Sequence, residues 1–149
     1  MRIKITAMLL LIVVLLGTVA FAMPDEIYSG DVGNTSDLIV ITKPPRDRSA
    51  TFDRSYVISG YGREGTAVAI YTQLSGGTYA KTNYVWQIGA STFFAIPIEL
   101  DARNNYLIVR AEGDGGSYQH NRLEITYIGS NLSDVMNNIT VDPRNLLIN

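Results

Sequence analysis

Short runs of alternating apolar and polar residues recur along the chain after residue 37, separated by turn-forming residues. Side chains on a β-strand point alternately to opposite faces, so each run predicts a strand with one face in a core. The clearest run is 120–129, where Leu123 and Ile125 share one face and Arg122 and Glu124 share the other. Seven strands are predicted in this way: 38–42, 55–62, 66–74, 84–89, 93–100, 106–111 and 120–129.

This pattern predicts an all-β fold, an antiparallel β-sandwich of about seven strands. A small barrel is the alternative, because both architectures close alternating strands around one core. Leu107, Val109 and Ala111 are expected to face that core. Pro97 has no N–H to offer a ladder, so its strand is expected at a sheet edge or a bulge.

The first 22 residues have the composition of an export signal. Arg2 and Lys4 precede an uncharged apolar run, and the Ala-Phe-Ala at 20–22 suits a signal peptidase. We therefore predict a signal peptide over 1–22. The uncharged stretch over 5–22 has 18 residues, just enough to cross a bilayer, so an uncleaved membrane anchor is the alternative. Both interpretations place the remainder outside the cytoplasm, secreted or at the cell surface.

Composition narrows the classes of function. Removing the first 22 of the 149 residues leaves 127, enough for one domain with its own core. The chain has no cysteine, which excludes disulfides and thiolate metal sites. The leader takes two of the twelve basic residues and no acidic one. The remainder therefore has ten basic and fourteen acidic residues, a net charge of −4, and no basic stripe for nucleic acid.

The segments flanking the strands carry weaker signals. Residues 23–36 are polar and lack periodicity, so a flexible arm is predicted there, followed by the sandwich over 37–129. The tail over 130–149 ends in the apolar sequence NLLIN. It is expected to pack back on the domain, or alternatively to add a strand to a neighbour's sheet edge.

Several short motifs occur in a recognisable order. A Pro-containing segment precedes the strand sequence VISG at 57–60, and a turn over 100–105 leads into the alternating strand with Leu107 and Ala111 and then a Gly-rich loop. This order resembles the bacterial immunoglobulin-like domains of exported and cell-surface proteins. In that family the turn contains a glycine, whereas Arg103 or Asn104 stands here. The resemblance implies the immunoglobulin-like form of the sandwich and says little about the ligand.

Candidate chemistry is sparse. His120 is the only histidine, no nucleophile elbow occurs, and an exposed loop position is expected for His120. One His and no Cys do not make a zinc site, so no metal or other cofactor is predicted. Asp114, with Glu112 nearby, is a weak candidate for calcium, although Asp-Gly pairs usually form turns. The chain is expected not to be an enzyme.

Aromatic residues give the main indication of a binding surface. Exposed rings on a flat sheet can stack on sugars or anchor a protein partner. The alternative is that Trp86 belongs to the core and the tyrosines are ordinary strand residues. Five rings lie within 26 positions of one another: Tyr61, Tyr71, Tyr79, Tyr84 and Trp86.

Taken together, these features predict an exported, non-enzymatic binding module. Its expected partner is another protein or a component of the cell envelope. A carbohydrate-binding module that uses the five aromatic residues is one alternative. A structural subunit that assembles through the 130–149 tail is another.

Overall fold

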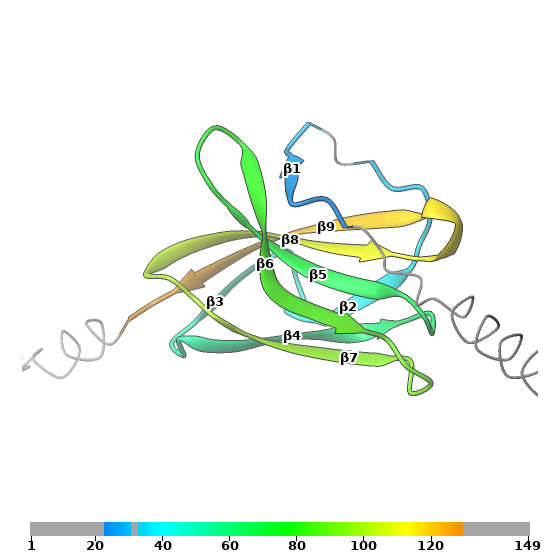
Figure 1. Ribbon diagram of the computed structural model, residues 1–149. Coiled ribbons are helices and arrows are strands. Elements are labelled where there is room, and N and C mark those ends of the chain that lie inside the picture. The colour runs from blue at the N-terminus through cyan, green and yellow to red at the C-terminus, as the bar shows by residue number, and fades with distance from the viewer. Residues whose placement is uncertain (1–22, 31–32, 130–149) are drawn as a thin grey trace, which may run out of the picture.

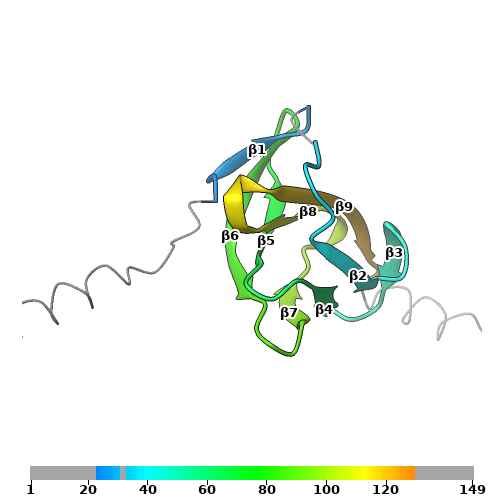
Figure 2. The same ribbon diagram turned by 90° about the vertical axis from the view of Figure 1, so that its right-hand side faces the viewer.

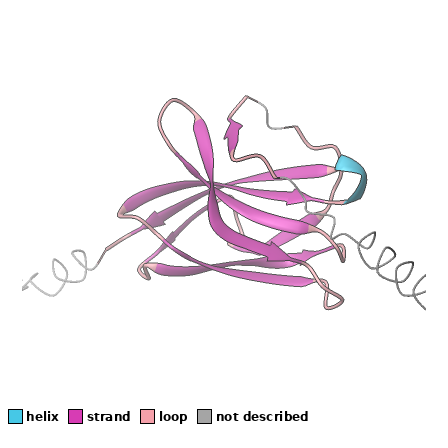
Figure 3. Cartoon of the chain, in the orientation of Figure 1, coloured by secondary structure: helices cyan, strands magenta, loops and turns pink. Residues whose placement is uncertain are grey.

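The structure is a computed structural model that describes residues 23–30 and 33–129. The predicted signal peptide (1–22) and tail (130–149) lie outside the described residues. The described chain is almost entirely strand and turn (Figure 3), and no helix within it could cross a membrane. Its elements are β1 (Glu26–Tyr28), β2 (Ile39–Lys43), β3 (Arg48–Thr51), β4 (Ser55–Gly62), β5 (Ala67–Gln73), β6 (Thr78–Gln87), β7 (Phe93–Glu99), β8 (Arg103–Glu112), the 3-10 turn η1 (Asp114–Gly116) and β9 (Tyr118–Tyr127).

The strands form two sheets, as the predicted sandwich requires (Figures 1 and 2). The larger sheet has the order β1-β6-β5-β8-β9-β3, and the smaller has the order β2-β4-β7. All pairs are antiparallel except β3 with β9, which is parallel. The seven predicted strands all occur. The two additional strands, β1 and β3, have only three and four residues, too few to show a period.

The core lies between the two sheets and is made by every second residue of the long strands. Leu107, Val109 and Ala111 of β8 belong to it, as predicted, and are at most 4% exposed. Ile58 of β4 and Phe94 of β7 face them from the smaller sheet and are fully buried. The alternation read from the sequence therefore corresponds to the burial pattern of these strands.

Pro97 lies in β7, at an edge of the smaller sheet, as predicted. The amide of Gly62 donates a hydrogen bond to the carbonyl of Thr92. In an antiparallel pair only every second residue bonds to the partner strand, so the even-numbered residues of β7 face β4. Pro97 is odd-numbered, and its backbone nitrogen therefore points away from β4. Its missing N–H therefore removes no bond from the ladder.

One side chain connects the two sheets where β2 and β9 approach without pairing. Gln119 of β9 accepts hydrogen bonds from the amides of Leu38 (2.6 Å) and Ile39 (2.8 Å) and donates to the carbonyl of Ile39 (3.1 Å). The amide of Arg63 donates a hydrogen bond to the carbonyl of Leu38. Since successive residues of a strand point their N–H and C=O groups to opposite sides, those of Ile39 point away from β4. Gln119 thus takes the place of a neighbouring strand at this seam.

On the opposite side of the sandwich, β6 of the larger sheet bends toward β7 of the smaller sheet. The register with β5 shifts from the pair Ala69–Val85 to the pair Tyr71–Lys81, which leaves extra residues on β6 and bends the strand. Within the bend, the hydroxyl of Tyr84 accepts a hydrogen bond of 3.3 Å from the amide of Glu99 in β7. The two sheets are therefore bridged on both sides by side chains.

A turn leads into β8, and Arg103, the first residue of that strand, has a positive φ of 75°. Glycine adopts such a conformation without strain. Asn105 stabilises the turn: its Oδ1 accepts from the amide of Asp101 (2.8 Å) and its Nδ2 donates to the carbonyl of Asp101 (3.0 Å). A second bond from Nδ2 to the carbonyl of Ile125 ties the turn to β9.

The N-terminal segment differs from the predicted flexible arm. Residues 23–28 lie along β6 in the larger sheet, with Ile27 paired to Tyr79 (Figure 1). Met23 and Ile27 are buried in a second apolar cluster on the outer face of that sheet, with Ile108 and Tyr79. These two apolar residues help to hold the segment, and two residues are too few to show a periodicity in the sequence.

Candidate functional site

The five aromatic residues proposed from the sequence do not form one exposed row. Tyr71 and Tyr79 are 0% and 7% exposed, so the expectation of a shared exposed surface is wrong for both. Tyr84 is half-buried against the core. Trp86 is 41% exposed, so the alternative that it belongs to the core is also wrong. Tyr61, on the smaller sheet, is the most exposed of the five, at 52%.

Tyr71 is buried because the N-terminal segment lies over it. Its hydroxyl donates a hydrogen bond of 2.6 Å to the carbonyl of Pro24. Burial raises the pKa of Tyr71 to about 12, so the hydroxyl remains a donor at any physiological pH. Lys81 holds the same segment through the carbonyl of Met23 (3.1 Å) and the carboxylate of Asp25 (2.9 Å). Tyr71 therefore fixes the arm and is not available to a ligand.

The outer face of the smaller sheet carries a continuous apolar row. In the register of β2, β4 and β7, Val40 lies opposite Tyr61, and Tyr61 lies opposite Phe93. Neighbours in such a row have Cβ atoms about 5 Å apart. The three side chains are 49%, 52% and 51% exposed. We call Val40, Tyr61 and Phe93 the small-sheet face.

A shallow hollow adjoins the small-sheet face. Its volume is about 220 Å³, and Val40 and Tyr61 form part of its wall. Asp37 and Arg63 also line it, so polar groups accompany the apolar surface at this end of the row. An apolar centre with polar groups at the rim is the usual composition of a protein–protein contact.

A second hollow lies on the larger sheet. Its volume is about 230 Å³, and it brings together residues from β3, β6, β8 and β9. Tyr106 of β8 is 41% exposed there, and the side chain of Arg122 reaches the carbonyl of Ser29 in the N-terminal segment. We call this hollow the Tyr106 groove. The charged and aromatic residues of its lining are Asp47, Arg48, Tyr79, Tyr106, Arg122 and Glu124.

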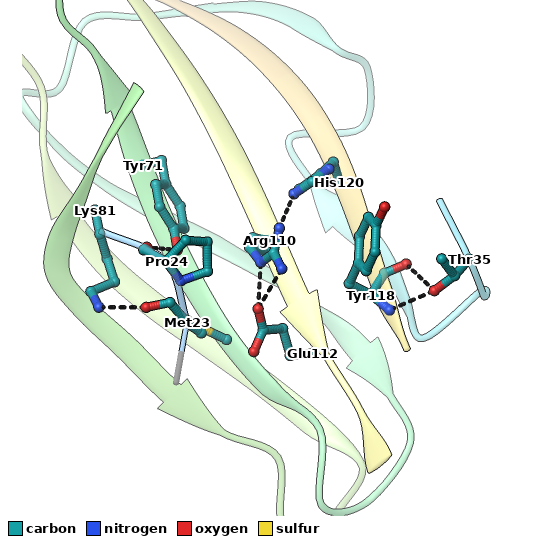
Figure 4. Close-up of polar contacts among 9 residues, drawn as sticks. All are labelled: Met23, Pro24, Thr35, Tyr71, Lys81, Arg110, Glu112, Tyr118 and His120. Atoms are coloured by element: carbon teal, nitrogen blue, oxygen red, sulfur yellow. Dashed lines mark hydrogen bonds and ion pairs between the residues drawn. The ribbon is translucent and has the colours of Figure 1, made fainter. Parts of the chain in front are cut away.

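A charged cluster occupies the same sheet. It lies between Met23 and Pro24 on one side and Thr35 on the other (Figure 4). Arg110 binds Glu112 through Nε at 2.6 Å and through a second nitrogen, and its Nη1 lies 2.7 Å from Nε2 of His120. The guanidinium also lies 4.9 Å from the ring centre of Tyr118, a cation–π distance. Thr35 exchanges hydrogen bonds with the backbone of Tyr118.

His120 is 6% exposed, so the expectation of an exposed loop histidine is wrong. Because Arg110 can only donate, Nε2 of His120 must accept, and the ring is neutral. Burial lowers the pKa of His120, and Arg110 lowers it further, against the opposing effects of the Gly33 backbone and Glu112. Nε2 of His120 is thus occupied by Arg110, whereas Nδ1 is buried without a hydrogen-bond partner among the described residues.

The candidate calcium ligands do not come together. The carboxylate of Glu112 is held by Arg110, whereas Asp114 lies in η1 and lines a small hollow with Glu64. Within residues 23–30 and 33–129, no three His, Cys, Asp or Glu side chains are grouped to hold a metal ion.

Sequence reasoning missed Val40, Phe93 and the Tyr106 groove. A signal for the first two exists: β2 and β7 read IVITK and FFAIPIE, with apolar residues on both phases. An apolar run without alternation implies two apolar faces, and a two-layer sandwich covers only one of them. The groove has no such signal, because its residues come from four separate strands.

A scan against protein-family models and a search of curated proteins found no match to this chain. The resemblance to bacterial immunoglobulin-like domains therefore remains a prediction from the motifs quoted above.

Proposed function

We propose that this chain is an exported, non-enzymatic binding module whose small-sheet face docks a protein partner. The observation that carries the proposal is the alignment of Val40, Tyr61 and Phe93 across three strands, each about half exposed. Contiguous apolar surface in contact with water is costly, and in soluble proteins it marks interaction sites. Aromatic anchors such as Tyr61 are the residue type that dominates binding free energy in such contacts.

The rigidity of the smaller sheet favours this function. A Cβ atom at Gly60 would lie 2.1 Å from the carbonyl of Val40, so β2 and β4 approach closely only because this residue is glycine. Side chains fixed on such a backbone lose little conformational freedom when a partner binds. A partner with a flat, apolar face of its own is the best match to this surface.

The remaining parts of the proposal come from the sequence. The 1–22 segment would export the chain to the cell surface or the exterior, and the motif order assigns the sandwich to the bacterial immunoglobulin-like group. The absence of enzymatic activity is supported by the position of His120, which is buried beside Arg110. Carbohydrate binding by the five original aromatic residues is less well supported, because Tyr71 and Tyr79 are covered.

Site-specific photo-crosslinking tests the proposal. A photoreactive amino acid is placed at Tyr61 or Phe93 of the full chain in its native cells, with Tyr28 as the matched control. Tyr28 is 56% exposed but lies on the larger sheet. We expect a discrete adduct with one partner protein from positions 61 and 93 and none from position 28.

Two results would contradict the docking proposal. One is equal or absent crosslinking at all three positions. The other is an adduct of exactly two copies of this chain, which would favour the self-assembling subunit instead. Replacing Tyr61 by Ser should abolish the adduct at position 93. The free energy of unfolding, measured in urea, should change by no more than about 0.5 kcal/mol, as is usual for surface substitutions.

A further inference from the structure

We propose that the Tyr106 groove binds a neutral saccharide of one or two rings. This inference does not depend on the proposed docking function, since the groove lies on the larger sheet and shares no residue with the small-sheet face. The argument has three parts: the walls of the groove, the polar groups around it, and their combined charge and size.

The walls offer a surface for the apolar face of a sugar. Tyr106 projects from β8 and is 41% exposed, so its ring supplies the accessible apolar surface, whereas Tyr79 of β6 is only 7% exposed. A sugar ring has C–H groups on its faces and hydroxyls around its rim. An aromatic ring that is open on one side can therefore bury the C–H face without covering the hydroxyls.

Charged groups surround the ring. Nε of Arg48 lies 3.1 Å from the carboxylate of Glu124; the Arg48 side chain is 87% exposed and that of Glu124 is 27% exposed. The parallel pairing of β3 with β9 sets these two residues side by side. The side chain of Arg122 is anchored on the carbonyl of Ser29. A guanidinium has five donors and a carboxylate about four acceptor positions, so both retain free hydrogen-bonding capacity after these contacts.

The charge and size of the groove favour a neutral ligand. Arg48 and Arg122 are balanced by Asp47 and Glu124, so neither an anion nor a cation gains from the site as a whole. Adjacent donors and acceptors match neighbouring hydroxyls, each of which both donates and accepts. The volume of about 230 Å³ is below that of a site for a drug-sized ligand, roughly 300 Å³ or more. A mono- or disaccharide unit fits that limit.

An NMR titration of the ¹⁵N-labelled full chain tests the inference. The probes are maltose, cellobiose and N,N′-diacetylchitobiose, each added up to about 20 mM, which detects affinities in the millimolar range. We expect at least one probe to give saturable shifts centred on the amides of Tyr106, Arg122 and Glu124. Replacing Tyr106 by Ala should weaken that binding about tenfold, because a stacked ring contributes roughly the 1.4 kcal/mol that a tenfold change represents.

Phe52→Ala is the matched control, because Phe52 is an exposed ring (66%) outside the groove. It should bind the same probe as tightly as the original chain. Arg122→Gln should weaken binding while the tyrosine ring remains, which separates recognition of hydroxyls from stacking. The inference is overturned if no probe gives saturable shifts, if the shifts centre elsewhere, or if Tyr106→Ala binds as well as Phe52→Ala. None of these outcomes bears on crosslinking at the small-sheet face.

Discussion

Gln119→Met removes the side-chain bridge between β2 and β9 while keeping a side chain of similar length. Gln119 is 7% exposed, and Leu38 and Ile39 are each 4% exposed. The substitution therefore leaves two amides and one carbonyl buried without their partner. An orphaned buried polar group costs about 1–3 kcal/mol, so we expect the three groups together to cost about 3–9 kcal/mol. A domain of this size has a total stability of about 5–15 kcal/mol.

Urea denaturation followed by circular dichroism measures this loss directly. Gln87→Met is the matched control, since Gln87 is exposed and makes one side-chain bond, to the carbonyl of Gly65. That control should lose less than about 1 kcal/mol. Hydrogen exchange at Leu38 and Ile39 should accelerate in Gln119→Met. If the two variants lose the same free energy, Gln119 does not hold the seam and the reasoning is refuted.

Two further predictions concern His120 and Arg103. The pKa of His120 is lowered in the folded protein. The stability that the neutral ring contributes is therefore fully present above the pKa of the unfolded chain, about 6.5. It is lost as the pH falls from there toward the pKa of the folded protein. The slope of unfolding free energy between about pH 5 and 7 should approach 1.4 kcal/mol per unit at most. His120→Gln should remove this component of the slope, and an unchanged slope in that variant would contradict the assignment. Arg103→Gly should gain about 0.5–1 kcal/mol in urea denaturation, because φ at this position is positive. Arg103→Ala keeps the Cβ atom and should gain nothing, so an equal gain in both variants would exclude backbone strain as the cause.

The sequence was most informative where one face of a strand meets a core. Leu107 and Val109 were placed correctly because alternation reports which face is buried. Pro97 was placed at an edge because of a missing donor, a property of the residue itself. By contrast, β1 and β3 have too few residues for a period to emerge.

The candidate site was harder to predict because exposure depends on partners distant in sequence. Tyr71 and Trp86 both lie in strands, yet the segment around Pro24 covers Tyr71, whereas Trp86 is 41% exposed among the residues that the structure describes. His120 is buried by Arg110 and by a loop about 86 residues earlier, whose Asn34 accepts from the His120 amide. A single sequence shows none of these pairings, so residue type alone could not separate binding rings from buried ones.

The unequal attachment of the two ends of the sandwich has a mechanical consequence. A pull at Met23 loads β1, which lies at a sheet edge with three paired residues that can open one after another. A pull at Tyr127 loads β9, which is paired with β8 over ten residues and with β3 on its other side. Under tension between its ends, the domain would therefore yield first at the N-terminal segment. Tyr71 and Ile108 would be uncovered while the layer between the two sheets stays closed.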